Sequence, residues 1–347
     1  MQLQAQTRRV RTLLERLERL VPRIALAVAP VAIFLVLRSQ RDALGELRGA
    51  VGWHDVLTSA LAFMVAPVVQ GLSFWLVLRL LTKATPLADA LVVWSRSYVL
   101  RYAPTGTLAI AYRLSSRRRL HASADQILAA YAYEHVGALA AAAVACLVLF
   151  AAMATLPPLL PLSIVIVTLA LTAMLRPGIA GRAVERIARR FGLHLSVVLE
   201  GRHVATVVAV NAVGWLGTGA AVYVLVVAAT GEAPSFLWLV GSYTAGYLVG
   251  FVAPLAPGGI GAREGTLVVL LGPHYGPGLA LAISLAIRVA NVAGELLAVL
   301  LIHAAYGARV LIRTWRKRRP LDVMRDLGAD GAPSPRALAA IRPAEAR

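Results

Sequence analysis

The chain has 347 residues, of which 59% are hydrophobic, and its 35 basic and 17 acidic residues give a formal net charge of +18. The apolar residues form long runs and the basic residues gather in short segments between them, a pattern that excludes an ordinary soluble domain and argues against a nucleic-acid partner. The sequence therefore predicts an all-α, polytopic helical membrane protein. Its single cysteine, Cys146, lies inside an apolar run and cannot form an intrachain disulfide, so we expect a small core residue.

Three parts follow one another along the chain. Residues 1–20 are a basic amphipathic segment, in which leucines share one helical face. Residues 21–305 form the helical transmembrane domain, with helix breaks at 102–107 and 254–261. Residues 306–347 are basic and then polar, and we expect a disordered cytoplasmic tail.

The transmembrane domain contains about six predicted full spans, each apolar over most of its length. They are residues 21–37, 56–81, 126–154, 159–175, 203–230 and 278–305. Two further apolar segments, 87–114 and 236–271, are interrupted by the breaks, and we predict re-entrant hairpins that enter from opposite sides. This topology places every arginine-rich loop and both termini in the cytoplasm, as the positive-inside rule requires for an integral protein of the cytoplasmic (inner) membrane.

The two hairpins share a weak pattern that suggests an inverted repeat. Each has a Ser-Tyr pair, then a break with proline and glycine, then an arginine. The members are Ser97-Tyr98, Pro104 to Gly106 and Arg113 in the first hairpin, and Ser242-Tyr243, Pro257 to Gly259 and Arg263 in the second. Paired breaks in two halves of a transporter indicate a central binding site.

The second break carries the strongest motif. Proline and glycine end the apolar run at Pro254, and a new helix is expected to begin near Ala262, with Arg263 and Glu264 side by side. A guanidinium beside a helix break in a membrane can bind a phosphate bidentately. We favour this role for Arg263, whereas Arg113 adjoins a basic loop and is expected to snorkel to the interface.

Two other polar groups interrupt apolar runs. Ser284, Arg288, Asn291 and Glu295 follow one another at helical spacing in the last span and form one stripe. The stripe either lines a substrate path or holds a buried ion pair that bridges helices. Glu134, near Tyr131 and His135, is a natural partner for Arg101, Arg113 or Arg263, and we favour a structural ion pair over proton coupling.

Milder features have simpler interpretations. Asn211, Trp215 and Thr218 are expected to join helices, and the small residues of Gly214–Gly219 could pack closely, including in a homo-oligomer. The histidines show no metal-ligand spacing, no Ser/His/Asp or Cys/His arrangement can be assembled, and no nucleotide fingerprint occurs. The sequence thus predicts no cofactor and no metal.

Ala256–Glu264, with the sequence Ala-Pro-Gly-Gly-Ile-Gly-Ala-Arg-Glu, resembles the signature of the lysylphosphatidylglycerol synthase transmembrane region. This flippase-like family includes the membrane half of the multiple peptide resistance factor. Arg101–Gly106 resembles the family's earlier Arg-Tyr-x-Pro-Gly element, with Thr105 where glycine usually stands, and Glu134 and Arg288 fall at polar positions of the pattern. The resemblance covers about residues 20–305.

The resemblance implies that two-domain members aminoacylate phosphatidylglycerol with a soluble domain and translocate the product with the membrane domain. Only 42 residues (306–347) follow the last predicted span, too few for a catalytic domain. We therefore expect a chain that is not an enzyme.

The leading hypothesis is a lipid translocator, which moves an anionic or zwitterionic phospholipid, or a polyprenyl-phosphate-linked lipid, through a polar cavity between the hairpins. The alternative is a membrane scaffold that regulates cell-envelope biosynthesis enzymes. A third hypothesis is small-solute transport, but the sequence shows no ion site that favours it. The predicted substrate-binding residues are Arg101, Pro104, Gly106, Glu134, Pro257, Gly258, Gly259, Gly261, Arg263, Glu264, Arg288, Asn291 and Glu295.

Overall fold

The computed structural model describes residues 51–100, 107–152, 199–232, 235–252 and 261–317. All secondary structure within these ranges is helical, as predicted. Several predicted features lie outside the described residues, among them the spans 21–37 and 159–175 and all of the two breaks except Thr107 and Gly261. The predicted site residues in the same position are Arg101, Pro104, Gly106, Pro257, Gly258 and Gly259.

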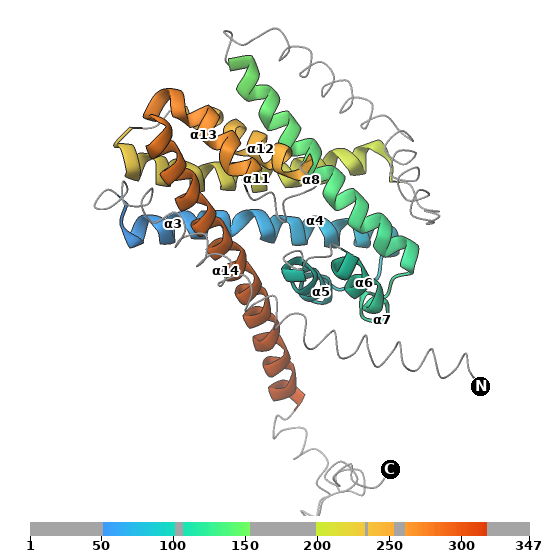
Figure 1. Cartoon of the computed structure of the whole chain (residues 1–347). Coiled ribbons are helices and arrows are strands. Elements are labelled where there is room, and N and C mark those ends of the chain that lie inside the picture. Colours follow the sequence, from blue (N-terminus) through green and yellow to red (C-terminus); the bar gives the residue numbers. More distant parts are fainter. Residues whose placement is uncertain (1–50, 101–106, 153–198, 233–234, 253–260, 318–347) are drawn as a thin grey trace, which may run out of the picture. The chain divides into compact units, whose positions relative to one another are not determined.

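The helices follow one another along the chain as Figure 1 labels them. They are α3 (Trp53–Phe63), α4 (Val65–Thr82), α5 (Leu87–Val99), α6 (Thr107–Ser115), α7 (Arg117–Leu120), α8 (Ala124–Ala152), α11 (Gly201–Thr230), α12 (Phe236–Val252), α13 (Ala262–Tyr275) and α14 (Pro277–Lys317).

Four helical stretches within the described ranges are long and apolar enough to cross a membrane. They are Trp53–Thr82, Ala124–Leu147, Gly201–Thr230 and Pro277–Leu311. Each coincides with one predicted span. The two predicted hairpins contain shorter helices instead, α5 with α6 and α12 with α13, on either side of the breaks. The span count of the whole chain, the re-entry of the hairpins and the inverted repeat stay predictions.

The first described span is divided between α3 and α4 at Met64. Pro67 lacks a backbone N–H, and its ring crowds the carbonyl of Phe63, four residues earlier. The Met64 N–H nevertheless donates to the Ala60 oxygen at 3.0 Å, so the chain continues across the interruption as one stretch of 30 residues.

Helix α11 contacts α3, α4, α8 and α12, and α12 contacts α8 and α13. Small residues permit these close approaches. A Cβ added at Gly137 of α8 would lie 2.5 Å from Val207 Cγ1 of α11, and one added at Gly294 of α14 would lie 2.5 Å from the Ala60 carbonyl oxygen. Alanine at Gly137 would require the Val207 side chain to move, and alanine at Gly294 would require the backbone around Ala60 to move.

Two residues of the stripe predicted on α11 join helices, as expected, whereas Thr218 Oγ1 donates to the Gly214 oxygen of its own helix. The Asn211 amide donates to Ser73 Oγ of α4 at 3.0 Å, and Trp215 Nε1 donates to the Ala138 oxygen of α8 at 3.0 Å. Gly214 and Gly219 also pack inside the chain, against Ala66 and Val240, so this face is used by the protein's own helices.

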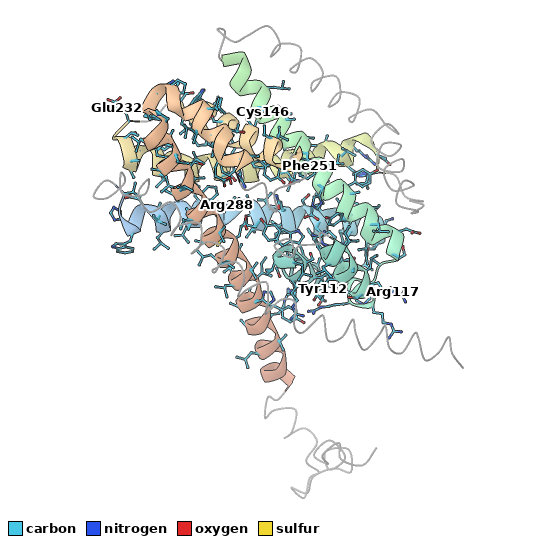
Figure 2. The ribbon with its side chains drawn as sticks, in the orientation of Figure 1. Tyr112, Arg117, Cys146, Glu232, Phe251 and Arg288 are labelled. Atoms are coloured by element: carbon cyan, nitrogen blue, oxygen red, sulfur yellow. The ribbon has the colours of Figure 1, made fainter. Side chains whose placement is uncertain are left out.

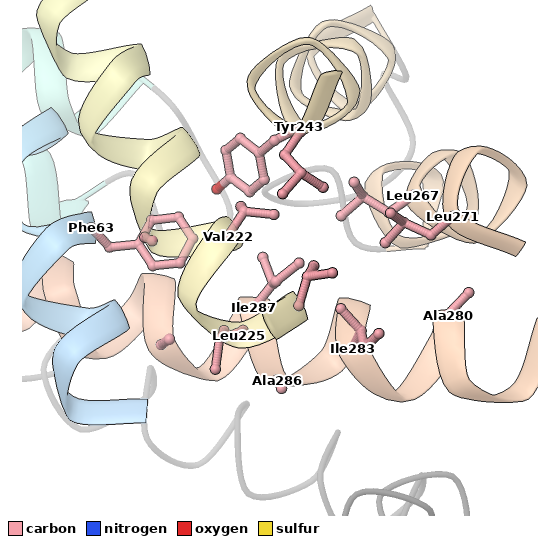
Figure 3. Close-up of a cluster of buried hydrophobic side chains, with 14 of the residues drawn as sticks. Phe63, Val222, Leu225, Tyr243, Leu267, Leu271, Ala280, Ile283, Ala286 and Ile287 are labelled. Atoms are coloured by element: carbon pink, nitrogen blue, oxygen red, sulfur yellow. The ribbon is translucent and has the colours of Figure 1, made fainter. Parts of the chain in front are cut away.

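The apolar core joins helices that are far apart in the sequence. Figure 3 shows Ile283 and Ile287 of α14 beside Val222 and Leu225 of α11, with Tyr243 of α12 close by. Cys146 is buried, as predicted, with its sulfur 3.4 Å from Thr244 Oγ1.

The chain divides into two compact units, Met1–Val299 and Leu300–Arg347. The first contains the core and both polar clusters described below. The described part of the second, residues 300–317, is the last part of α14, and its exposed apolar side chains include Leu300 and Leu311.

Candidate functional site

A buried ion pair lies at the first hairpin, between Arg113 of α6 and Glu134 of α8. Arg113 Nη1 is 2.5 Å from Glu134 Oε2, and the two side chains are only 3% and 5% exposed. The second carboxylate oxygen accepts from Trp94 Nε1 at 2.6 Å, and Arg113 Nε donates to Ser97 Oγ at 2.7 Å. We call these four residues the Arg113 cluster. Its opposite charges and hydrogen bonds compensate for burial in an apolar environment.

Two aromatic rings also contact the Arg113 guanidinium. Arg113 Cζ lies 4.3 Å from the centre of the Phe74 ring on α4 and 4.9 Å from that of Tyr131 on α8. These contacts add cation–π attraction without using the N–H donors. Helices α4, α5, α6 and α8 therefore all meet at one cation whose charge is neutralised locally.

The Arg113 cluster bears on two predictions, the location of the Arg113 side chain and the partner of Glu134. Arg113 was expected to snorkel to the interface, and this is wrong, because Glu134 offers a buried carboxylate within reach. Of the arginines considered as partners of Glu134, Arg113 forms the ion pair, and Arg101 lies outside the described residues. Sequence reasoning missed Trp94 and Ser97 as members; the available signal was their i, i+3 spacing on one face of an apolar helix.

The second hairpin carries a different arrangement around Arg263. Arg263 Cζ lies 4.3 Å from the ring centre of Tyr243 and 5.5 Å from that of Tyr247, which are one turn apart on α12. Tyr247 in turn packs edge-on against Trp215, with ring centres 4.8 Å apart. A Cβ added at Gly246 would lie 3.2 Å from the Arg263 carbonyl oxygen, so a glycine here brings α12 and α13 close together.

Arg263 and Glu264 do not pair with each other, because adjacent residues on a helix point in different directions. Among the described residues, no carboxylate lies within 4.0 Å of the Arg263 guanidinium. Its positive charge, half-buried at the start of α13, is contacted by the faces of the two tyrosine rings.

Glu264 instead caps the helix that follows the break. Its Oε2 accepts from the Gly261 N–H at 2.7 Å, and Gly261 has a φ of +88°, which glycine adopts readily. The helix begins at Ala262, as predicted. The other oxygen, Oε1, lies 3.9 Å from Arg288 Nη1 of α14, with side chains 13% and 17% exposed. We call Tyr243, Tyr247, Arg263, Glu264 and Arg288 the Arg263 cluster.

The polar stripe on α14 is largely buried. Ser284, Asn291 and Glu295 are 1%, 9% and 4% exposed, and Arg288, labelled in Figure 2, bridges to α13 through Glu264. The bridging role expected of a buried ion pair is thus present for Arg288, through Glu264. Ser284 Oγ is buried and has no hydrogen-bond partner within the described part of the chain.

The predicted site residues within the described ranges therefore separate into two groups. Gly261, Arg263, Glu264 and Arg288 meet at the start of α13, and Asn291 and Glu295 continue along α14. Glu134 belongs to the Arg113 cluster. No group of three or more His, Cys, Asp or Glu that could hold a metal occurs in the described part of the chain.

Several apolar helices of membrane-spanning length, with the buried Arg113 and the half-buried Arg263 beside interrupted segments, define a polytopic α-helical membrane protein. Residues 20–319 match the family Lysylphosphatidylglycerol synthase TM region, and the chain belongs to this family. The resemblance that rested on Ala256–Glu264 is thereby confirmed. No curated protein sequence matches the chain.

Proposed function

We propose that this protein is a lipid translocator of the cytoplasmic membrane, and that the Arg263 cluster receives a phosphate-bearing head group. The observation that carries the proposal is the Arg263 guanidinium, held over the faces of Tyr243 and Tyr247 beside a helix break with no carboxylate nearby among the described residues. A half-buried cation in this state favours an anionic ligand.

The chemistry of arginine suits a phosphate group. The planar guanidinium carries five N–H donors in a fork that matches two phosphate oxygens. The tyrosine faces attract the cation without engaging these donors, so the fork stays available for a ligand. The start of α13 contributes a partial positive charge, part of which Glu264 already engages.

In this proposal the segments α5–α6 and α12–α13 are re-entrant hairpins of an inverted repeat, which enter from the cytoplasm and from the outside. The head group would move through a polar cavity between them while the acyl or prenyl chains stay in lipid. Arg101 and the Pro and Gly residues of both breaks shape that path, and Glu264 and Glu295 engage a cationic part of a zwitterionic head group. The protein performs no chemistry on the lipid.

A head-group flipping assay in proteoliposomes tests the proposal. Phospholipid with a fluorescent head group is incorporated, and a membrane-impermeant reductant reports exchange between leaflets for wild type, Arg263→Ala and Arg263→Lys. We expect Arg263→Ala to lower the rate at least about tenfold, as lost phosphate contacts would require. Lysine keeps the charge but not the fork and should restore the rate only in part.

Arg202→Ala is the matched control, because Arg202 is 76% exposed and pairs with Glu200 at the start of α11. Its rate should equal that of wild type. A folded Arg263→Ala protein that exchanges lipid at the wild-type rate would overturn the proposal. Stoichiometric recovery of an envelope-biosynthesis enzyme with that protein in mild detergent would then favour the scaffold function.

A further inference from the structure

Trp215 of α11 contacts both tyrosines that lie beside Arg263. Its ring centre is 4.8 Å from that of Tyr247 and 6.4 Å from that of Tyr243, within the range of paired aromatic rings, and the residue is only 6% exposed. The same two tyrosine rings have their centres 5.5 and 4.3 Å from Arg263 Cζ. One buried tryptophan therefore packs against each of the rings that contact the guanidinium.

The Trp215 ring is itself fixed by helix α8. Its Nε1 donates to the Ala138 oxygen at 3.0 Å, and Ala138 lies one turn beyond Glu134 on α8. A tryptophan side chain has only two rotatable bonds, so one hydrogen bond and a packed ring leave it little freedom. Trp215 thus connects the helix that carries Glu134 with the tyrosines beside Arg263.

Two glycines keep the neighbouring helices close together around this tryptophan. A Cβ added at Gly219 of α11 would clash with Val240 Cγ2 of α12, and one added at Gly246 of α12 would lie 3.2 Å from the Arg263 carbonyl oxygen of α13. Tyr243 also packs against Phe63 of α3, with ring centres 5.6 Å apart (Figure 3). Because the surroundings are this tight, a displaced Trp215 ring would move the tyrosines with it.

We propose that Trp215 is a positioning residue of the head-group site, which sets the places of Tyr243 and Tyr247 and through them the direction of the Arg263 N–H donors. The inference rests on the proposed function and deepens it, because it assigns a residue that acts without touching the lipid. A bidentate contact with two phosphate oxygens needs its donors placed to within about 0.5 Å. The supporting ring is therefore expected to matter for phosphate affinity.

The indole N–H can be removed without leaving a buried group unsatisfied. The Ala138 carbonyl lies inside α8 and also accepts the bond of that helix, so Trp215→Phe keeps an aromatic ring and orphans no acceptor. Trp75→Phe is the matched control, because Trp75 Nε1 likewise donates to a backbone oxygen, that of Thr85 at 3.2 Å, at the end of α4.

Lipid binding by the full-length protein in detergent micelles tests this role. The probe is dioleoylphosphatidic acid, whose phosphate is its entire head group, and the reference is dioleoylglycerol, which has the same chains and no phosphate. Apparent affinities are measured by native mass spectrometry for wild type, Trp215→Phe, Trp75→Phe, Arg263→Ala and the double variant of Trp215→Phe with Arg263→Ala.

Trp215→Phe should weaken the binding of phosphatidic acid about fivefold and leave that of dioleoylglycerol unchanged, and Trp75→Phe should change neither. In the Arg263→Ala background, Trp215→Phe should have no further effect, because it acts only through the guanidinium. Unchanged phosphatidic acid binding by Trp215→Phe, or equal weakening with and without Arg263, would overturn the positioning role.

Fluorine NMR of the wild-type sequence labelled with 5-fluorotryptophan gives a second readout. The Trp215 signal is assigned by its absence from Trp215→Phe or Trp215→Tyr. It should shift when phosphatidic acid is added and stay in place with dioleoylglycerol, because the tyrosine rings beside it respond to a ligand on Arg263. The Trp75 signal should not move with either lipid. A Trp215 signal that is unchanged at saturating phosphatidic acid would overturn the role.

Arg263→Ala alone separates this inference from the proposed function. If that variant binds phosphatidic acid as wild type does, the phosphate site is refuted and the role of Trp215 with it. If Arg263→Ala weakens binding at least about tenfold while Trp215→Phe does not weaken it, the phosphate site stands and only the role of Trp215 is overturned.

Discussion

The two interrupted segments of this membrane protein each contain a buried or half-buried arginine. The two arginines differ in the groups that surround the guanidinium charge. In the first, Arg113 is neutralised by Glu134 at 2.5 Å and is 3% exposed. In the second, Arg263 lies over two tyrosine rings, and the adjacent carboxylate of Glu264 is directed to the Gly261 N–H and to Arg288. The two segments thus share a sequence pattern, but only the first places a carboxylate beside its arginine among the described residues.

The difference indicates which of the two arginines has hydrogen-bond donors available for a ligand. A cation that already has a carboxylate and a hydroxyl partner gains little from a phosphate, because the new contact would have to displace strong hydrogen bonds. A cation that is held by π faces keeps its donors available. We infer that the Arg113 cluster fixes α4, α5, α6 and α8 together, and that the Arg263 cluster interacts with substrate.

The largest expected effect is on the Arg113 cluster. Glu134→Gln keeps an oxygen that can accept from Trp94 but leaves the buried Arg113 charge without a counter-ion. We expect a loss of about 3 kcal/mol in the free energy of unfolding, as is typical when one member of a buried pair is removed. Thermal or denaturant unfolding in detergent micelles measures it.

The double variant Arg113→Met with Glu134→Gln tests whether the unpaired charge of Arg113 causes the loss of stability. Removal of both charges should recover at least half of the lost stability, because a neutral core of similar volume needs no counter-ion. If the double variant is less stable than Glu134→Gln alone, the charge of Arg113 is not the cause of the loss, and the comparison between the clusters fails.

Arg263→Met is the direct counterpart in the second cluster. It removes cation–π contacts with Tyr243 and Tyr247 and leaves no carboxylate behind in the described surroundings, so the cost should be about 1 kcal/mol. Arg113→Met, which orphans Glu134, should cost about 3 kcal/mol in the same assay. Equal losses from the two substitutions would show that Arg263 is as structural as Arg113.

The described transmembrane helices could be predicted from sequence because they are long apolar runs. The start of α13 at Ala262 was also predictable, since proline and glycine end one helix and Gly261 begins the next. The partner of Glu134 could not be chosen among three arginines, because the choice depends on how α6 packs against α8. The same limit explains why Trp94, Ser97 and the tyrosine faces beneath Arg263 were not predicted: each contact joins helices whose relative rotation the sequence does not specify.

Glu264 offers a smaller and more selective test of the second cluster. Glu264→Ala removes both the cap on the Gly261 N–H and the charge beside Arg288, and it should cost about 1 kcal/mol. Glu264→Gln can still accept from Gly261, so about half of that loss should be recovered. The unfolding assay used for Arg263→Met measures the stability of both Glu264 variants. If glutamine is no better than alanine, the contact with Arg288 outweighs the cap.

Ser284→Ala has the smallest expected effect and the opposite sign. Because the Ser284 hydroxyl is buried without a partner among the described residues, its removal should stabilise the protein by about 0.5 kcal/mol, whereas Ser95→Ala should destabilise it by about the same amount. Both variants are compared with wild type in detergent after thorough removal of lipid. Destabilisation by Ser284→Ala would mean that the hydroxyl is satisfied in the folded protein, for instance by an ordered water. Stabilisation would show that burial of this hydroxyl lowers the stability of the folded protein.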